Sequence, residues 1–423
     1  MKKLLRTGCA LILAGALAPA WGASGPDLAL EEAVAEALRE NAALRAMEAR
    51  AGAMLERPVQ LRTLPNPMLN VGGMDPAGDF GFPDSQETRV GIEQGLPWFG
   101  KRGLRGAVAE KEAEAMAGDY QAMRRDVVMS VKEAYYDLFA LQQVLAATRA
   151  EEDVLKRMEE IAQTKYATGS AEQQDVLKAQ AEITMLRQRL LELEQQESVL
   201  KARLNQLLNR AADSPLGRAA TPPPAGEPGE MDGLLEQAAS DRPEIATARA
   251  RAEQAGLERR LMTREYFPDL KLGVESRSFT EGDDMLMVMI GVDLPVWRNK
   301  NRAGVREAER MIEATRAGIE AAEKETAYEV QDAYFKLRTA RRSLDLYRQA
   351  LIPQAEARFA ASDAGYRAGT TDFLDLLESE RFLLEARVMA AMTEGNVGMQ
   401  WARLERAAGT KLEELPKRAR KHE

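Results

Sequence analysis

Hydrophobic and polar residues alternate at two places in the chain, about 200 residues apart, and predict a pair of β-strands at each. In DLKLGVESRSF the apolar residues Leu270, Leu272 and Val274 occupy every second position, which is typical of a strand with one apolar face. The next segment, DMLMVMIGVDLPV, is apolar at odd and even positions alike, so alternation supports that strand less well. We expect four strands, at about 67–74, 87–96, 269–279 and 284–296.

Each strand pair is followed by a helix of unusual length. From Gly103 to Tyr166 there is no proline, and an unbroken helix there would span ~95 Å at ~1.5 Å per residue. The corresponding segment, Asn301 to Tyr366, is interrupted only by Pro353. Apolar positions recur at three- and four-residue spacing, which favours antiparallel coiled coils over a compact core. Segments rich in Ala, Leu, Glu and Arg predict a further helix before each strand pair, at about 29–56 and 231–264.

The two halves are copies of one plan. VKEAYYDL at 131–138 matches VQDAYFKL at 330–337, and KYATGSAEQQDVL at 165–177 matches GYRAGTTDFLDLL at 365–377. Duplication at a fixed distance indicates a repeated structural unit. We therefore expect a signal peptide at 1–22, a first repeat at 23–211, a Pro/Gly-rich linker at 212–230, a second repeat at 231–411 and a C-terminal tail at 412–423.

Composition excludes most chemistry. Lys and Arg followed by an apolar run from Cys9 to Leu17 and then by small residues predict a secretory signal, cleaved after Gly22. The mature chain would keep 55 basic against 67 acidic residues, no cysteine, and His422 as its only histidine. Zinc sites, thiol chemistry and Ser-His-Asp relays lack their residues, and the acidic balance disfavours nucleic-acid binding. We expect neither an enzyme nor a cofactor.

The strands predict an oligomer. No later apolar run reaches the ~18 residues that a spanning helix needs, whereas strands of about ten residues match a membrane at barrel tilt. Four strands cannot close a barrel, because the smallest use about eight and an open edge in lipid leaves backbone groups unsatisfied. Three chains would supply twelve strands. The alternative that stays open is a soluble coiled-coil protein with two β-hairpins.

The junctions GLPWFGKRG and DLPVWRNKNRAG, the turns YATGSAEQQDVL and YRAGTTDFLDLL, and the duplicated plan resemble the TolC-type outer-membrane efflux family. The resemblance covers essentially the whole mature chain. The form LPWFGKRG, together with LPNPML at 64–69, is most similar to the heavy-metal-efflux branch of CzcC- and CusC-like proteins.

The resemblance implies an α+β membrane protein that forms a homotrimer, with a twelve-stranded β-barrel in the outer membrane and a long α-helical barrel in the periplasm. Such a protein is a passive exit duct without cofactor. It works with a periplasmic adaptor and an inner-membrane pump, usually of the resistance–nodulation–division class, and in this branch the cargo is metal cations. Two alternatives stay open: a duct for drugs or secreted proteins, and a periplasmic coiled-coil adaptor or scaffold.

Both turns share a tyrosine, a glycine and an acid in register, at Tyr166, Gly169 and Asp175 and at Tyr366, Gly369 and Asp375. Glycine adopts the left-handed conformation that ends a helix. We expect Ser170 and Gln173 to form a capping box for the first return helix, and Thr370 or Thr371 to cap the second.

The tip expected to face adaptor and pump comprises Gly169, Ser170, Gly369, Thr370, Thr371 and Asp372. An acid early in a helix also favours the helix dipole, and for Asp175 and Asp372 this structural interpretation stays open beside the functional one.

By the resemblance, the second return helix lines the periplasmic entrance, and Asp375 and Glu378 match its acidic constriction. Threefold symmetry would make each of them a ring of three carboxylates that attracts cations and repels anions.

The predicted gate also includes Asp175 and Tyr166, which match positions that hold the family's entrance shut, and Tyr366, which repeats Tyr166 in the second copy. The chain departs from the family at Thr371, where some members carry an arginine. Lys178 stands in the first copy where Glu378 stands in the second, so the closing contacts are not settled by the resemblance.

The junction GLPWFGKRG predicts a passage from strand to helix at the membrane surface. Pro97 ends the strand ladder, and Trp98, Phe99 and, in the second copy, Trp297 are expected in an aromatic girdle. Lys101 and Arg102 would reach lipid phosphates. The alternative is a packed turn, and both can hold together.

Methionines alternate at Met285, Met287 and Met289. Thioethers bind soft metals, but alternation favours one apolar face of the barrel over a metal site, which stays the alternative.

Overall fold

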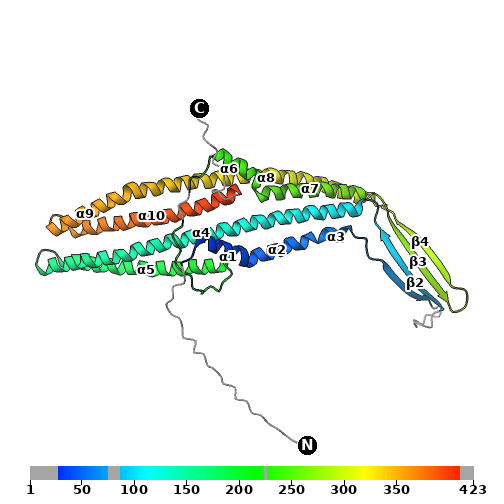
Figure 1. Ribbon diagram of the computed structural model, residues 1–423, viewed down its shortest axis with the longest axis horizontal. Coiled ribbons are helices and arrows are strands. Elements are labelled where there is room, and N and C mark those ends of the chain that lie inside the picture. The colour runs from blue at the N-terminus through cyan, green and yellow to red at the C-terminus, as the bar shows by residue number, and fades with distance from the viewer. Residues whose placement is uncertain (1–26, 75–85, 223–225, 410–423) are drawn as a thin grey trace, which may run out of the picture.

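The computed structural model describes residues 27–74, 86–222 and 226–409. The molecule is elongated, with a β-sheet at one end, the tips of two helical hairpins at the other and shorter helices between them (Figure 1). The predicted signal peptide and C-terminal tail lie outside the described residues.

Before the strands lie α1 (Leu30–Glu40), α2 (Ala42–Leu55) and α3 (Arg57–Arg62) in the first copy, and α6 (Met231–Asp241) and α7 (Pro243–Arg264) in the second. The strands are β1 (Met68–Met74), β2 (Glu87–Leu96), β3 (Asp269–Phe279) and β4 (Met285–Asp293). The first hairpin is α4 (Lys101–Ala167) and α5 (Gln173–Leu207). The second is α8 (Arg298–Leu346), a π-helix (Tyr347–Leu351), α9 (Ile352–Ala368) and α10 (Phe373–Ala408).

The single helix expected before each strand pair is wrong, because both are broken at the same place in the repeat. In the first copy Asn41 separates α1 from α2, and its side-chain oxygen accepts a hydrogen bond from the Leu44 N–H as an N-cap. In the second copy Pro243 begins α7, since proline can start a helix but not continue one.

The two hairpins differ in continuity. α4 runs unbroken for 67 residues, close to 100 Å at ~1.5 Å per residue. The second hairpin is interrupted by the π-helix, which ends two residues before Pro353, and the missing N–H of this proline removes one helical hydrogen bond. The predicted interruption is confirmed, in the form of a π-helix.

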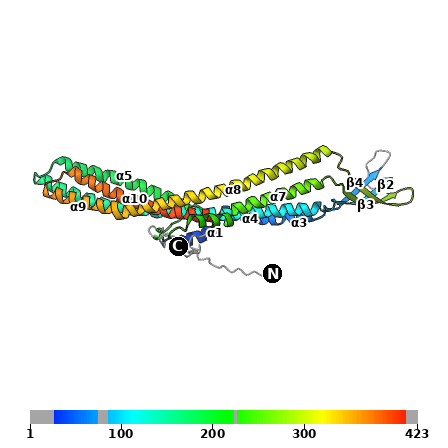
Figure 2. The same cartoon turned by 90° about the horizontal axis from the view of Figure 1, so that it is seen from above.

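The hairpins lie side by side, and α10 holds them together (Figure 2). α10 packs against α4, α8 and α9, whereas α5 packs against α4. Two glycines permit the approach of α10 to α4: a Cβ added to Gly395 would lie 2.8 Å from the Tyr136 carbonyl oxygen, and one on Gly398 would lie 2.2 Å from the Tyr136 ring.

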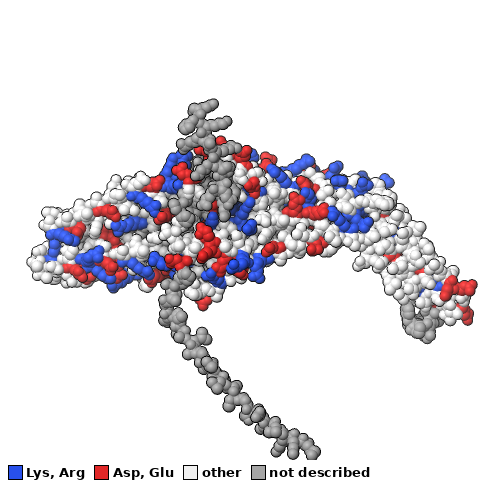
Figure 3. All heavy atoms as spheres, in the orientation of Figure 1, with Lys and Arg blue, Asp and Glu red and all other residues white. Residues whose placement is uncertain are grey.

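Within one chain, large apolar side chains stay exposed along two of the long helices. They are Leu177, Met185, Leu191 and Val199 on α5 and Met311, Tyr328, Phe335 and Leu346 on α8. Lys, Arg, Asp and Glu are spread over the rest of the helical part, while the visible face of the sheet is mostly uncharged (Figure 3).

The four strands form one antiparallel sheet in the order β1-β2-β3-β4. The strand register places aliphatic and charged side chains on opposite faces of the sheet. Ile92, Val274 and Val288 are paired in one row, and the next row pairs Gly91 with Glu275 and Met287. One face is therefore aliphatic and the other carries the charged residues.

Exposure in the sheet is the reverse of that in a water-soluble fold. The aliphatic Leu286, Val288 and Ile290 are 70–74% exposed, whereas the side chains of Glu87 and Glu275 on the opposite face are 12% and 14% exposed. The expectation that Met285–Met289 form an apolar face is wrong, because the register places these methionines on the charged face. Among the described residues, β1 and β4 each leave one edge of the sheet unpaired.

The strand-to-helix junction is a packed turn. Gly100 adopts a left-handed φ of 85°, and the ring of Trp98 stacks on that of Phe267 with centroids 5.7 Å apart. Lys101 does not reach phosphates: it is 2% exposed, and its Nζ lies 2.9 Å from Asp269 and 3.3 Å from Glu265. Arg102 donates to the Arg62 carbonyl oxygen at 3.2 Å.

The aromatic residues of the junction divide between packing and exposure. Trp98 is half-buried, while Phe99 and Trp297 are 81% and 76% exposed. These two side chains are free to meet a lipid headgroup.

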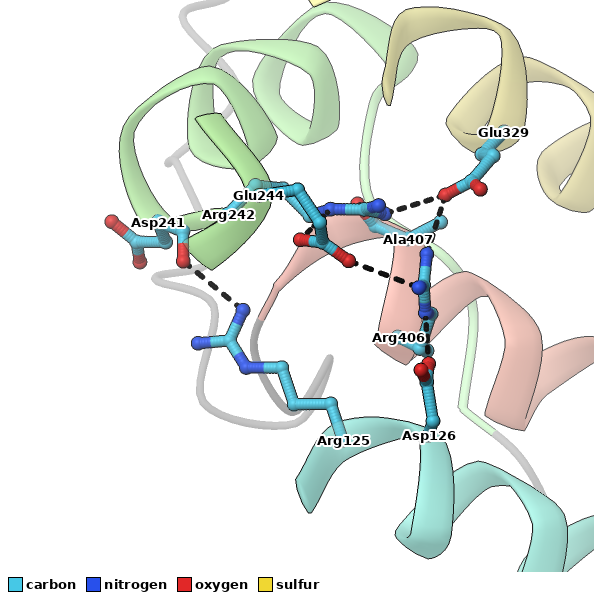
Figure 4. A network of polar contacts seen from close by, with 8 residues as sticks. All are labelled: Arg125, Asp126, Asp241, Arg242, Glu244, Glu329, Arg406 and Ala407. Carbon is cyan, nitrogen blue, oxygen red and sulfur yellow. Dashed lines mark hydrogen bonds and ion pairs between the residues drawn. The ribbon is translucent and has the colours of Figure 1, made fainter. Parts of the chain in front are cut away.

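At mid-length an arginine cluster ties the second copy to the first (Figure 4). Arg242, 3% exposed, pairs with Glu244 at 2.9 Å and with Glu329 at 2.7 Å. Arg406 pairs with the same two acids and with Asp126 of α4. The start of α7, the end of α10, α8 and α4 are thereby fixed to one another.

None of the helices in the described ranges is both long and apolar enough to cross a membrane.

Candidate functional site at the hairpin tips

The two turns have the same backbone. In the first, the Gly169 N–H donates to Tyr166 and the Ser170 N–H donates to Lys165; in the second, the corresponding bonds run from Gly369 and from Thr370. The φ angles of the glycines are 71° and 78°. This is the double hydrogen bond of a Schellman ending, which needs a left-handed residue.

The predicted caps of the return helices are wrong. The N-cap of α5 is Glu172, which makes no side-chain capping bond, so Ser170 and Gln173 form no capping box. The cap of α10 is Asp372, whose Oδ1 accepts from the Phe373 N–H at 2.7 Å. Asp372 is one residue closer to the helix than Thr371, and an Asp is as good a cap as Thr.

A lysine joins the tips of the two hairpins. Lys165 Nζ donates to the carbonyl oxygen of Tyr366 and lies 4.3 Å from the centroid of its ring, a cation–π contact. Lys165 was not among the predicted site residues, although it directly precedes Tyr166 in the duplicated motif.

The two tyrosines of the duplicated motif occupy different environments. Tyr366 is 4% exposed and packs against Phe373, with ring centroids 5.2 Å apart, in an apolar core shared by α4, α5, α9 and α10. Burial raises the pKa of Tyr366 to about 12, and the carboxylates of Asp175 and Asp372 add to the effect. Tyr166 is 48% exposed.

The acids of the duplicated motif differ in the same way. Asp175 is 7% exposed, its pKa is raised by burial, and its partner is Lys178 at 3.8 Å on the same helix. Asp375 and Glu378 are both exposed on α10. Neither has an ion pair or side-chain hydrogen bond with any residue in the described part of the chain. These two carboxylates are thus available to solvent and to passing ions.

A second acidic pair, absent from the predicted site, lies deeper along the hairpins. Glu151 of α4 and Glu380 of α10 are 3% and 2% exposed, and each keeps one buried carboxyl oxygen without a partner. Burial and the neighbouring Glu151 carboxyl raise the pKa of Glu380, and burial raises the pKa of Glu151. Two buried carboxyl groups in contact cannot both be charged, so they share a proton.

In the described part of the chain, no arginine or lysine forms an ion pair with Glu151 or Glu380. Arg381 beside this pair is bound to Glu182 of α5, and Arg157 and Arg387 act on Glu151 only at longer range. A signal was present in the sequence, since Glu380 stands where the first copy has Gln180. No group of three or more His, Cys, Asp and Glu that could hold a metal ion occurs within residues 27–74, 86–222 and 226–409.

Comparison with known proteins decides the family. The model of the outer membrane efflux protein family matches residues 33–210 and 234–410, which is both copies of the repeat. The chain belongs to the outer membrane efflux protein family.

Relatives of this efflux protein include a metal-resistance protein and an outer membrane protein. It is 26% identical over 383 residues to the cobalt-zinc-cadmium resistance protein CzcC of Cupriavidus metallidurans, with 86% of each chain covered. It is 24% identical over 322 residues to the outer membrane protein TolC of Vibrio cholerae, which covers 72% of this chain and 73% of TolC.

Solved structures share the fold. The structure of CusC aligns with a TM-score of 0.78 at 17% identity and covers 90% of this chain and 92% of that chain. The outer membrane protein VceC of Vibrio cholerae aligns with a TM-score of 0.75 at 19% identity and covers 90% and 96%.

The predicted family, fold class and localisation are confirmed. The efflux protein has the fold of these outer-membrane proteins. Members of the family are channels in the outer membrane rather than enzymes.

Proposed function

We propose that this efflux protein is the trimeric outer-membrane exit duct of a tripartite system that expels heavy-metal cations. The cations are delivered by an inner-membrane pump of the resistance–nodulation–division class and a periplasmic adaptor. The duct itself performs no chemistry.

The inverted sheet is the observation that carries this proposal. A face with Leu286, Val288 and Ile290 at 70–74% exposure is unfavourable in water and favourable against lipid. The two unpaired edges need partners in a membrane, and β4 of one copy beside β1 of the next satisfies both. Three copies then close twelve strands.

The helical part supports the same assembly. The apolar side chains on α5 and α8 are 48–63% exposed among the described residues, and they would be buried where neighbouring copies meet. The α10 helices would then face the axis near the tips, where Asp375 and Glu378 form two carboxylate rings that favour cations over anions.

The relative CzcC favours metal cations as cargo, because its name states resistance to cobalt, zinc and cadmium. A second candidate cargo is an organic metal chelator. The chain is 23% identical over 299 residues to the pyoverdine export protein OpmQ of Pseudomonas putida, of which 63% is covered. The acidic rings favour the free cation over an anionic chelate.

Deletion of the gene in its native host tests the proposal. We expect sensitivity to zinc, cadmium or cobalt salts to rise, with drug sensitivity unchanged, and the full chain to restore resistance. The purified protein should run as a heat-modifiable trimer from the outer-membrane fraction and conduct K⁺ in planar bilayers. A periplasmic monomer, or a mutant sensitive only to drugs, would contradict the proposed assembly or the proposed cargo respectively.

A further inference from the structure

The methionines of β4 have an unexpected position. Met285, Met287 and Met289 are paired with Arg277, Glu275 and Gly273 of β3, all on the charged face. The residues between them, Leu286, Val288 and Ile290, lie on the aliphatic face. In the closed barrel the aliphatic face meets lipid, so the methionines face the water-filled lumen.

A general need for apolar side chains does not explain this distribution. Leucine, valine and isoleucine occupy the lipid-facing positions of β4 from 286 to 292, and methionine occupies every second position from 285 to 289. An apolar residue gains nothing from facing water, and lumen positions of barrels are usually polar. The property that methionine has and the aliphatic residues lack is a thioether sulfur, a soft ligand.

We propose that this ladder of thioethers binds soft monovalent cations, Cu⁺ or Ag⁺, on their way through the barrel. The inference rests on the proposed function, because it requires the charged face to line the lumen. It extends the cargo of the duct from the metal cations considered above to soft cations that prefer sulfur ligands.

Contacts in the sheet hold the methionine side chains over charged neighbours. Arg277 Nη2 lies 3.9 Å from Met287 Sδ, and Arg277 is itself paired with Glu275 at 2.7 Å and with Glu87 at 3.7 Å. Met289 lies across the strand over Gly273, where an added Cβ would come within 3.3 Å of its methyl group. Gly273 thus leaves room for the methionine beside the carboxylates.

The spacing suits transfer from one sulfur to the next. Alternate residues of a strand are ~6.7 Å apart, and methionine has three rotatable bonds, so neighbouring thioethers can reach the same cation. The carboxylates of Glu275 and Glu87 on the same face are paired with Arg277, so the sulfurs, and not a net negative charge, would select the cation. Neutral thioethers hold a soft cation less firmly than thiolates do, which permits release, as conduction requires.

The edge position of β4 extends the ladder to the next copy. In the closed barrel β4 pairs with β1 of the neighbouring chain. Met68 of β1 is paired with Glu93, which in turn pairs with Gly273, so Met68 is on the same face as Met289. Each junction between copies therefore brings methionines from two chains to the lumen.

Planar-bilayer recording on the purified full chain tests the inference, with K⁺ current as readout and silver nitrate in chloride-free buffer as probe. We expect micromolar Ag⁺ to lower the K⁺ current about twofold or more, reversibly, because a bound soft cation obstructs the pore. The triple variant M285L/M287L/M289L should conduct K⁺ as before and lose the response. The control Met311→Leu replaces a methionine of α8, outside the sheet, by an apolar side chain of similar size and should keep the response.

The outcomes separate the two proposals. K⁺ current without an Ag⁺ effect, or an equal effect in the triple variant, would overturn the methionine ladder and leave the duct intact. Absence of any K⁺ current would overturn both. If the triple variant does not assemble, Met287→Leu alone should weaken the Ag⁺ response, and an unchanged response would contradict the inference.

Discussion

The first and second hairpins are copies of one unit with the same turn, but they differ in burial. The return helix α10 of the second hairpin is more buried than α5 of the first, whereas Asp375 at the second tip is exposed and Asp175 at the first is buried. α10 is wedged between α4 and α8, whereas α5 packs mainly against α4, meets α10 only towards the tips and leaves an apolar stripe uncovered. At the tips, Lys165 has its counterpart in Gly365, where an added Cβ would lie 2.1 Å from the Thr371 hydroxyl. The duplication preserved the backbone, and the two copies then took different positions in one channel.

The largest expected effect is a loss of folding stability when the close approach of α10 to α4 is blocked. Gly395→Leu should destabilise the protein by about 3 kcal/mol or more, because the new side chain meets the Tyr136 backbone and Ala140. Thermal unfolding of the detergent-solubilised protein measures it. The corresponding residue of the first hairpin, Gln195, is exposed, and Gln195→Leu should change the stability little. Gly318→Leu, at a helical glycine with open space around it, is the matched control.

The buried acid pair should make stability depend on pH. The folded-state pKa of Glu380 is raised above its unfolded value, so the folded protein binds more protons, and stability falls as pH rises above the unfolded pKa. Glu380→Gln, which copies Gln180 of the first hairpin, should flatten this slope and raise stability at pH 8. A tenfold difference in proton affinity between the folded and unfolded states is worth ~1.4 kcal/mol. Unfolding midpoints from pH 5 to 9 test this, and an unchanged slope would contradict the shared proton.

The exposed acids should set ion selectivity. Glu378→Lys gives the second turn the charge arrangement of the first, Asp175 with Lys178, and would place three positive charges at the proposed constriction. We expect the cation preference in planar bilayers to fall several-fold, since lumen charge controls the local ion concentration. Glu172→Gln, at the exposed cap of α5, should leave it unchanged. Equal ion selectivity in both variants would contradict the proposal that α10 lines the entrance.

The smallest effect is expected at the link between the tips. Lys165→Met removes the hydrogen bond to Tyr366 and the cation–π contact, together about 1 kcal/mol. Amide hydrogen exchange should quicken in residues 165–171 and 365–372, with global unfolding unchanged. Lys156→Met, which breaks only the ion pairs with Glu152 and Asp153 within α4, should leave exchange at the tips as it was.

The sequence was most informative where a pattern has one structural cause. Alternation in β3 predicted its strand and faces, and the absence of proline predicted α4. In β4 apolar residues occupy both faces, so only the register with β3 could assign the methionines. Glu380 resembles a surface acid in sequence, and its burial follows from the packing of α4 against α10. Lys101 illustrates the same limit, since its partners Glu265 and Asp269 come from the other repeat.

The two unpaired edges of the sheet have a genetic consequence. In the proposed ring, every chain supplies one edge to each neighbour, so one defective chain opens the barrel for all three. A chain with a proline in the middle of β4, where it cannot complete the ladder, would still offer its helices for assembly. When it is expressed equally with the intact chain, random mixing leaves about one ring in eight with three intact copies. Such an allele should be dominant, and metal resistance should fall well below half.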